Sequence, residues 1–185
     1  MPNLKEKYQK EVIPQMQKIF NYKNKMAVPK IVKVVINTCF GKTAVTKTAG
    51  EREKVQNLVM QDLASIAGQK PKLVKSKKSI ASFKLREGLE IAAMVTLRKG
   101  KMWDFLERLV YLSLPRSRDF KGISQKSIDK RGNLNIGFRE HIFFSEILVE
   151  KEKTIFGLEI TVVTNAKSRE EGLELFRLIG FPIKT

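Results

Sequence analysis

The chain has 185 residues, 42% of them hydrophobic, which is enough for one folded domain with a substantial core. Lysine and arginine outnumber aspartate and glutamate by 36 to 19, and the resulting net charge of +17 favours a polyanionic partner. A single cysteine, Cys39, excludes an internal disulfide and a cysteine-rich zinc site, and the lack of an apolar run of roughly 20 residues excludes a membrane span.

The first third of the chain predicts two helices with a strand between them. Asn3 followed by Glu6 is typical of a helix start, and Pro14 is expected to kink or divide that helix. The β-branched run IVKVVIN, residues 31–37, predicts a strand. Apolar residues then recur with a helical period over 51–67, and a glycine ends the segment.

The middle of the chain predicts strands followed by an amphipathic helix. We expect a short strand near 72–75 and longer strands over 79–86 and 90–98. Apolar residues at helical spacing over 102–110 predict a helix that stops before Pro115.

The last third predicts two further strands, over 133–138 and 155–163, and a closing helix. That helix begins with the capping box of Ser168 and Glu171 and ends at Gly180. Helices interleaved with strands indicate an α+β fold: a mainly antiparallel sheet with helices packed on one face and the other face open. We expect a single domain over residues 1–185.

Alternation along the strands predicts which residues share a face of the sheet. Lys33, Val35 and Asn37 lie together, and Thr96 lies with Arg98 opposite an apolar set. The open face therefore mixes amides, hydroxyls and cations, which suits either solvent or the phosphates and 2′-hydroxyls of RNA. It lacks the aromatic stacking pairs of common RNA-recognition sheets.

The densest charge lies between residues 70 and 86, where seven cations occur without an acid. They are Lys70, Lys72, Lys75, Lys77, Lys78, Lys84 and Arg86. Such a run is usually a solvated surface. Because it lies between predicted strands, we expect Lys75, Ser76, Lys77 and Lys78 to form a projecting hairpin tip suited to phosphate contact.

Several motifs in fixed order carry a resemblance to a known family. They are VPKIVKVVIN, IAGQKP, KSKKSIASFKLREG, VTLR, LPRSRDFKG, GNLNIGFREHIFF and LIGFP. Together they span nearly the whole chain and closely resemble the universal 5S-rRNA-binding protein of the large ribosomal subunit, the family numbered five.

The resemblance implies a structural ribosomal protein that holds 5S rRNA and large-subunit rRNA in the central protuberance. Asn37, Gln69 and Thr96 match the family's rRNA-contacting positions, and Lys33 and Arg98 are candidate phosphate contacts. The loop with Lys75, Ser76, Lys77 and Lys78 resembles one that reaches P-site tRNA. The segment LPRSRDFKG resembles the region that meets a protein of the small-subunit head. The cytoplasmic ribosome is the simplest expected location, and an organelle ribosome is the alternative.

The chain departs from the family after the first strand, where Cys39 and Phe40 replace smaller or polar residues and leave the loop geometry open. Cys39 itself is expected to pack as a small, inert hydrophobe. Glu140, His141 and Glu146 resemble a metal or acid–base cluster only weakly, and a structural histidine is expected.

We expect no cofactor, catalytic site or membrane partner. A small basic nuclease, a peripheral membrane protein and a general nucleic-acid chaperone are the alternative functions.

Overall fold

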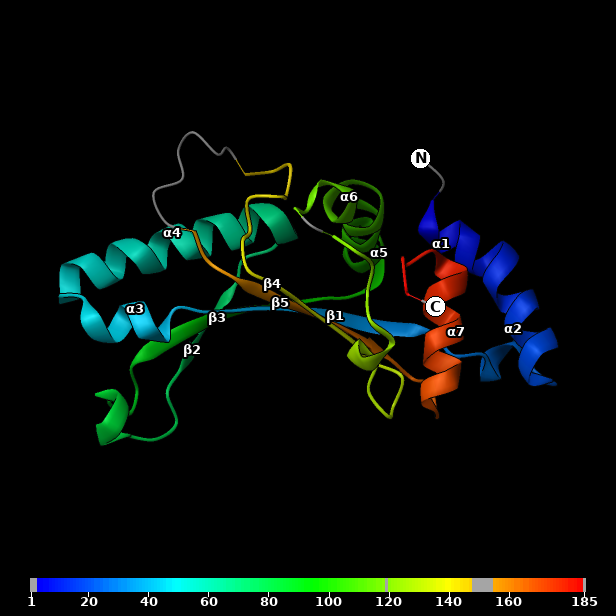
Figure 1. Cartoon of the computed structure of the whole chain (residues 1–185), viewed down its shortest axis with the longest axis horizontal. Coiled ribbons are helices and arrows are strands. Elements are labelled where there is room, and N and C mark those ends of the chain that lie inside the picture. Colours follow the sequence, from blue (N-terminus) through cyan, green and yellow to red (C-terminus); the bar gives the residue numbers. More distant parts are fainter. Residues whose placement is uncertain (1–2, 119, 148–154, 185) are drawn as a thin grey trace. The chain divides into compact units, whose positions relative to one another are not determined.

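The computed structural model describes residues 3–118, 120–147 and 155–184, and these form an α+β fold with a mainly antiparallel sheet (Figure 1). In the described residues the sheet has five strands in the order β2-β3-β1-β5-β4. The strands are β1 (Ile31–Cys39), β2 (Lys72–Lys75), β3 (Glu90–Leu97), β4 (Leu134–Phe138) and β5 (Leu158–Thr164). The helices are α1 (Leu4–Lys7), α2 (Ile13–Phe20), α3 (Gly41–Thr46), α4 (Ala49–Ala67), α5 (Lys99–Arg108), α6 (Leu114–Arg116) and α7 (Arg169–Ile179).

The chain forms two compact units, and four of the strands run from one into the other. The first unit comprises residues 1–34, 97–136 and 160–185, and the second comprises 35–96 and 137–159. Each unit is built from segments that are distant in sequence. The expectation of a single domain over 1–185 stays a prediction.

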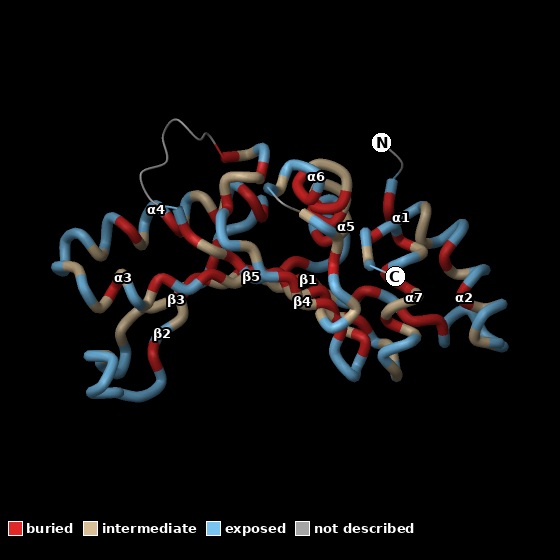
Figure 2. The backbone as a smooth tube through the Cα atoms, in the orientation of Figure 1, coloured by how far each residue is buried: buried red, intermediate tan, exposed pale blue. Residues whose placement is uncertain are grey.

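In the second unit, α4 packs on strands β1 and β3 by burying one stripe of its surface (Figure 2). Val59, Leu63 and Ile66 of α4 are buried, as are Ile36 of β1 and Val95 of β3. The helix begins at a Thr48–Glu51 capping box and ends at Gly68, whose φ of 62° is the left-handed conformation that glycine accepts without strain. The predicted helix over 51–67 is therefore confirmed, with two further residues at its start.

In the first unit, the N-terminal helical segment and α7 share a core with α5. Leu4, Met16, Phe105 and Phe176 are fully buried there. Lys7 donates a hydrogen bond from Nζ to the carbonyl oxygen of the last residue of α7, at 3.0 Å. The predicted caps are present: the Asn3 side chain accepts from the backbone at the start of α1, and Ser168 accepts from the Glu171 N–H at the start of α7.

Both helical prolines follow a π-helical turn, which is a feature that the sequence did not predict. Residues Tyr8–Val12 form such a turn before Pro14, and Leu109–Ser113 form one before Pro115. Proline lacks an N–H and its ring crowds the carbonyl of the preceding turn, so a wider turn relieves the conflict. The expectation that the helix stops before Pro115 was wrong, because the helical backbone continues through α6 to Arg116.

Candidate nucleic-acid interface

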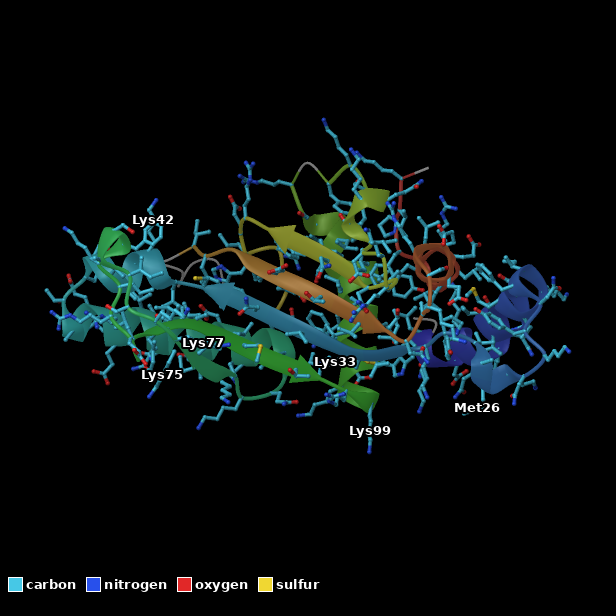
Figure 3. All side chains as sticks on the ribbon, turned by 90° about the horizontal axis from the view of Figure 1, so that it is seen from below. Met26, Lys33, Lys42, Lys75, Lys77 and Lys99 are labelled. Atoms are coloured by element: carbon cyan, nitrogen blue, oxygen red, sulfur yellow. The ribbon has the colours of Figure 1, made fainter. Side chains whose placement is uncertain are left out.

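The uncovered face of the second unit presents polar side chains from two adjacent strands. Asn37 of β1 and Thr96 of β3 are half-buried, whereas their strand neighbours Ile36 and Val95 point into the core beneath α4. Seen from the uncovered side, the strands lie in front of α4 (Figure 3). The predicted alternation is confirmed, and it leaves an amide and a hydroxyl group accessible on a rigid backbone.

Gln69 follows the end of α4 and lies beside Thr96. The left-handed turn at Gly68 ends the helix, and the Gln69 side-chain amide then donates from Nε2 to the carbonyl oxygen of Thr96 at 3.5 Å. Gln69 itself is exposed. Two of the residues that the resemblance singled out are thus neighbours in space although 27 positions separate them in the chain.

Lys72 is a further cation on the same face, and it is not among the contacts that the sequence predicted. Strand β2 runs antiparallel to β3 with Lys72 directly opposite Met94, and residues directly opposite share a face of the sheet. Met94 alternates with Val95 and therefore lies on the same side as Thr96. Lys72 is exposed at the sheet edge, so its ammonium group is available to phosphate.

The first unit carries Lys33 and Arg98, the two remaining predicted contacts. Lys33 is half-buried on β1 (Figure 3), and Arg98, the residue that precedes α5, is exposed. The uncovered face of this unit also holds a polar pair that sequence reasoning missed. Thr161 of β5 donates from its hydroxyl to the Asn135 side-chain oxygen of β4 at 2.8 Å. The hydrogen bond holds both groups in fixed orientations.

The segment between β2 and β3, residues 76–89, is called the basic loop here. Its start continues the hydrogen bonding between β2 and β3, because the Ser76 N–H donates to the Leu89 carbonyl oxygen at 2.8 Å. Ser76 is buried, and its hydroxyl donates to the Lys78 carbonyl oxygen. Lys75 pairs with Glu90 at 3.9 Å. Lys77 and Lys78 are exposed. The expectation that Lys75, Ser76, Lys77 and Lys78 form the projecting tip was therefore wrong. Lys75 ends β2, residues 76–78 form the base of the loop, and the tip lies farther along the chain.

The expected strand over 79–86 is replaced by a tight turn that forms the tip of the basic loop. Ile80 and Leu85 exchange two backbone hydrogen bonds of 2.9 and 3.1 Å around a 3₁₀ turn at Ala81–Phe83. Lys84 closes the turn in the left-handed conformation, with φ 51°. The Phe83 side chain is 70% exposed at this tip, and Ile80 is 40% exposed. An aromatic ring surrounded by cations is typical of a surface that stacks on nucleic-acid bases.

The residues after β1 form α3 in place of an irregular loop. Phe40 is buried and precedes the first residue of the helix, while Cys39 is exposed at the strand end. The expectation that Cys39 packs as a small hydrophobe was therefore wrong. Asn37 lies before Cys39 and Phe40, the residues that differ from the family, and it stays on the uncovered face.

His141 is a structural residue of the second unit, as expected. Its ring is fully buried, stacks on Phe156 at a centroid distance of 3.8 Å, and lies 3.8 Å from the Asp62 carboxylate through Nε2. Glu140 points to solvent. Across the described ranges no group of His, Cys, Asp and Glu side chains is arranged to hold a metal ion, and no helix is long and apolar enough to cross a bilayer.

Comparison with known proteins covers almost the whole chain. Residues 24–86 match the model described as Ribosomal protein L5, and residues 90–183 match the model of the C-terminus of the same ribosomal family. The chain is 49% identical to the large ribosomal subunit protein uL5 of Halothermothrix orenii over 98% of both chains. It is 50% identical to that of Geotalea uraniireducens over 100% of this chain and 99% of the relative. The chain therefore belongs to the ribosomal L5 family of large-subunit proteins.

Proposed function

We propose that this chain is a scaffold protein of the large ribosomal subunit that binds 5S rRNA through the uncovered face of its sheet. The observation that carries the proposal is that each unit presents amide, hydroxyl and cationic side chains on its uncovered strands or at their ends. The contributing residues are Lys33, Asn37, Gln69, Lys72, Thr96, Arg98, Asn135 and Thr161.

The chemistry of these groups matches a folded RNA. Amides and hydroxyls donate and accept hydrogen bonds, which suits ribose 2′-hydroxyls and phosphate oxygens in a shape-specific contact. Because six of these eight residues lie on strands, their backbone loses little conformational entropy when they bind. The net charge of +17 adds long-range attraction and the release of counterions.

The basic loop is proposed to contact P-site tRNA. Lys77 and Lys78 at the base of the loop are exposed cations, as are Lys84 and Arg86 farther along it, and the tip presents Phe83. Phosphate contacts from these cations carry no sequence information, and the aromatic ring adds a base-stacking surface. The two kinds of contact suit an RNA partner that is bound transiently.

The segment around LPRSRDFKG is proposed to meet a protein of the small-subunit head. Arg116 and Arg118 are exposed there, and Asp119 lies outside the described residues.

The relatives are bacterial, so the protein works in the cytoplasmic ribosome, and its family is structural rather than enzymatic. Large-subunit rRNA and neighbouring ribosomal proteins complete the proposed partners.

A competition measurement tests the proposal. Labelled 5S rRNA is bound to the full chain and displaced with unlabelled 5S rRNA or with an unrelated structured RNA of equal length at physiological salt. We expect 5S rRNA to displace the label at a concentration at least about tenfold lower. Equal displacement by the two RNAs would identify a general nucleic-acid chaperone and contradict the proposal.

A further inference from the structure

A second cationic loop lies in the first unit, directly before β4. It comprises residues 124–133 and is called the β4 loop here. Figure 1 shows it below the strands of this unit, on the side away from α5 and α6. Its exposed cations are Lys126, Lys130 and Arg131, and none of them is among the residues of the proposed interface.

Asp129 holds the second half of the β4 loop in one conformation. Its carboxylate accepts hydrogen bonds of 2.8 Å from the backbone N–H groups of Arg131 and Asn133 and from the Asn133 side-chain amide. The Asn133 side-chain oxygen in turn accepts from the Thr164 N–H of β5 at 3.0 Å. Lys130 and Arg131 therefore lie on a turn whose backbone is attached to the sheet.

The β4 loop also packs on the residues that lead into α7. Gly132 has a φ of 71°, and a Cβ at this position would lie 2.7 Å from the Cβ of Ala166. The Thr164 hydroxyl donates to the Gly132 carbonyl oxygen at 2.9 Å. At the start of the loop, the Arg169 guanidinium donates to the Gln125 carbonyl oxygen at 2.7 Å. Because both ends are attached to the fold, the loop backbone loses little conformational entropy when its cations bind a partner.

The charge around the β4 loop is positive even when the nearby acids are counted. The charged residues of the loop and of the segments bonded to it are Lys126, Lys130, Arg131, Lys167, Arg169 and Lys184, against Asp129, Glu170 and Glu171. All three carboxylates accept hydrogen bonds from N–H groups of the protein itself. Farther along α7, Glu174 pairs with Arg177 at 3.7 Å. The excess of cations therefore favours an anionic partner.

The position of the β4 loop indicates which anion it meets. Strand β4 begins at Leu134, directly after the loop, and its Asn135 forms with Thr161 the polar pair on the uncovered face of this unit. A polyanion that lies on this face therefore passes the β4 loop. An RNA backbone presents phosphates at regular spacing, and cations on a rigid turn bind them without reading the bases.

We propose that Lys130 and Arg131 of the β4 loop bind the phosphate backbone of the 5S rRNA that lies on the uncovered face, with Lys126 as a flanking contact. The fixed turn makes this contact specific for shape, because only a backbone that follows the spacing of the cations meets both of them. The inference rests on the proposed binding of 5S rRNA by the sheet.

The salt dependence of 5S rRNA binding tests the proposal. Lys130→Gln with Arg131→Gln is compared with Lys5→Gln with Arg116→Gln, which removes one exposed lysine from α1 and one exposed arginine from α6. We expect the loop variant to lose affinity at least about threefold at physiological salt, and its plot of log affinity against log salt to become shallower by roughly 0.9 for each duplex phosphate that is no longer neutralised. The control pair should change neither value by as much, and both variants should keep the urea midpoint of the wild type.

A tethered probe locates the contact. Iron–EDTA is attached to the full chain through Lys130→Cys, or through Arg116→Cys as the control, with Cys39→Ser because Cys39 is exposed. Hydroxyl radicals should cleave the bound 5S rRNA from position 130 and not from position 116. Absence of cleavage from position 130 would overturn the proposal, and so would a loop variant whose affinity and salt dependence equal those of the control pair. Failure of the sheet interface is recognised separately, because Asn37→Ala and Thr96→Ala would then leave the 5S rRNA affinity unchanged whatever the β4 loop does.

Discussion

The side-chain amide of Gln69 donates to the carbonyl oxygen of Thr96 at 3.5 Å, which joins the end of α4 to strand β3. Because the acceptor is a backbone carbonyl, the Thr96 hydroxyl is not used in this contact. It is therefore available to an RNA partner, as is the nearby amide of Asn37 on the adjacent strand.

Removing these polar groups should weaken 5S rRNA binding without unfolding the protein. We expect Asn37→Ala and Thr96→Ala each to lower the affinity by about two- to tenfold, the range of one hydrogen bond. Affinity is measured by filter binding and stability by urea unfolding. Asn57→Ala, which removes an exposed amide from α4, is the matched control. Unchanged affinity in both sheet variants would remove these residues from the interface.

The cations at the base of the basic loop should affect tRNA and spare 5S rRNA. Lys77→Gln with Lys78→Gln should reduce the salt dependence of P-site tRNA binding to ribosomes that carry the variant, by roughly 0.7 log unit for each phosphate that is no longer neutralised. Lys75 is left in place because Glu90 already pairs with it. Lys5→Gln with Lys54→Gln, at two exposed helical lysines, is the control. A large decrease in 5S rRNA affinity in the loop variant would show that the two surfaces are not separate.

Phe83 should contribute to tRNA binding through its ring. Phe83→Ala is expected to weaken P-site tRNA binding by about fivefold or more, because stacking of one base contributes roughly 1–3 kcal/mol. Phe83→Trp should retain the affinity, since it keeps an aromatic surface. The side chain is largely exposed, so neither change should alter the urea midpoint. Equal binding by the alanine and tryptophan variants would argue against stacking.

Two glycines of the first unit should be essential to its packing. A Cβ on Gly172 of α7 would overlap the backbone of Gly132, which precedes β4. We expect Gly172→Ala to lower the free energy of unfolding by more than about 2 kcal/mol. Gly50→Ala in α4 is the control, because its added methyl meets nothing within 4 Å and should be neutral or stabilising. Similar urea midpoints for the two variants would contradict the close approach.

Asp129 should make stability depend on acidic pH. Burial favours the neutral carboxyl, but hydrogen bonds from Asn133 and from the Arg131 N–H outweigh it and lower the pKa. A depressed folded pKa contributes stability above the unfolded value, which is lost as the pH falls through the folded pKa. Below about pH 4 the wild type should therefore lose the stability that ionised Asp129 contributes. Asp129→Asn never has this contribution, so its free energy of unfolding should fall less between neutral and acidic pH. Urea unfolding of both proteins at neutral and acidic pH gives the comparison.

Local patterns predicted most of the elements because their causes are local. The Ser168 cap at the start of α7, the glycine stops at Gly68 and Gly180, and the strand alternation all depend on residues within a few positions. The reciprocal half of the predicted capping box is absent, because the Glu171 carboxylate accepts from the Lys167 N–H. The continuation of the helical backbone through Pro115 was not predictable, because it depends on the preceding turn, Leu109–Ser113, which widens to accommodate the proline ring.

The tip of the basic loop and the place of Lys72 depend on longer-range pairing. Residues 79–86 have strand-like composition, but the chain reverses between Ile80 and Leu85 and leaves room only for a turn. Lys72 lies on the uncovered face because it pairs with Met94 on the neighbouring strand. This register depends on both strands, so neither segment alone predicts it. The hydrogen bond between Gln69 and Thr96 likewise requires the packing of α4 on β3. Family resemblance identified those two residues without revealing that they touch.

The most direct test of the RNA interface is ultraviolet cross-linking of the full chain to 5S rRNA, with the linked peptides mapped by mass spectrometry. If the uncovered face binds the RNA, the cross-links should fall in β1 and β3 and at Gln69, and should be absent from the solvent-facing side of α4. Cross-links confined to the helices, with strands β1 and β3 unlabelled, would contradict the account.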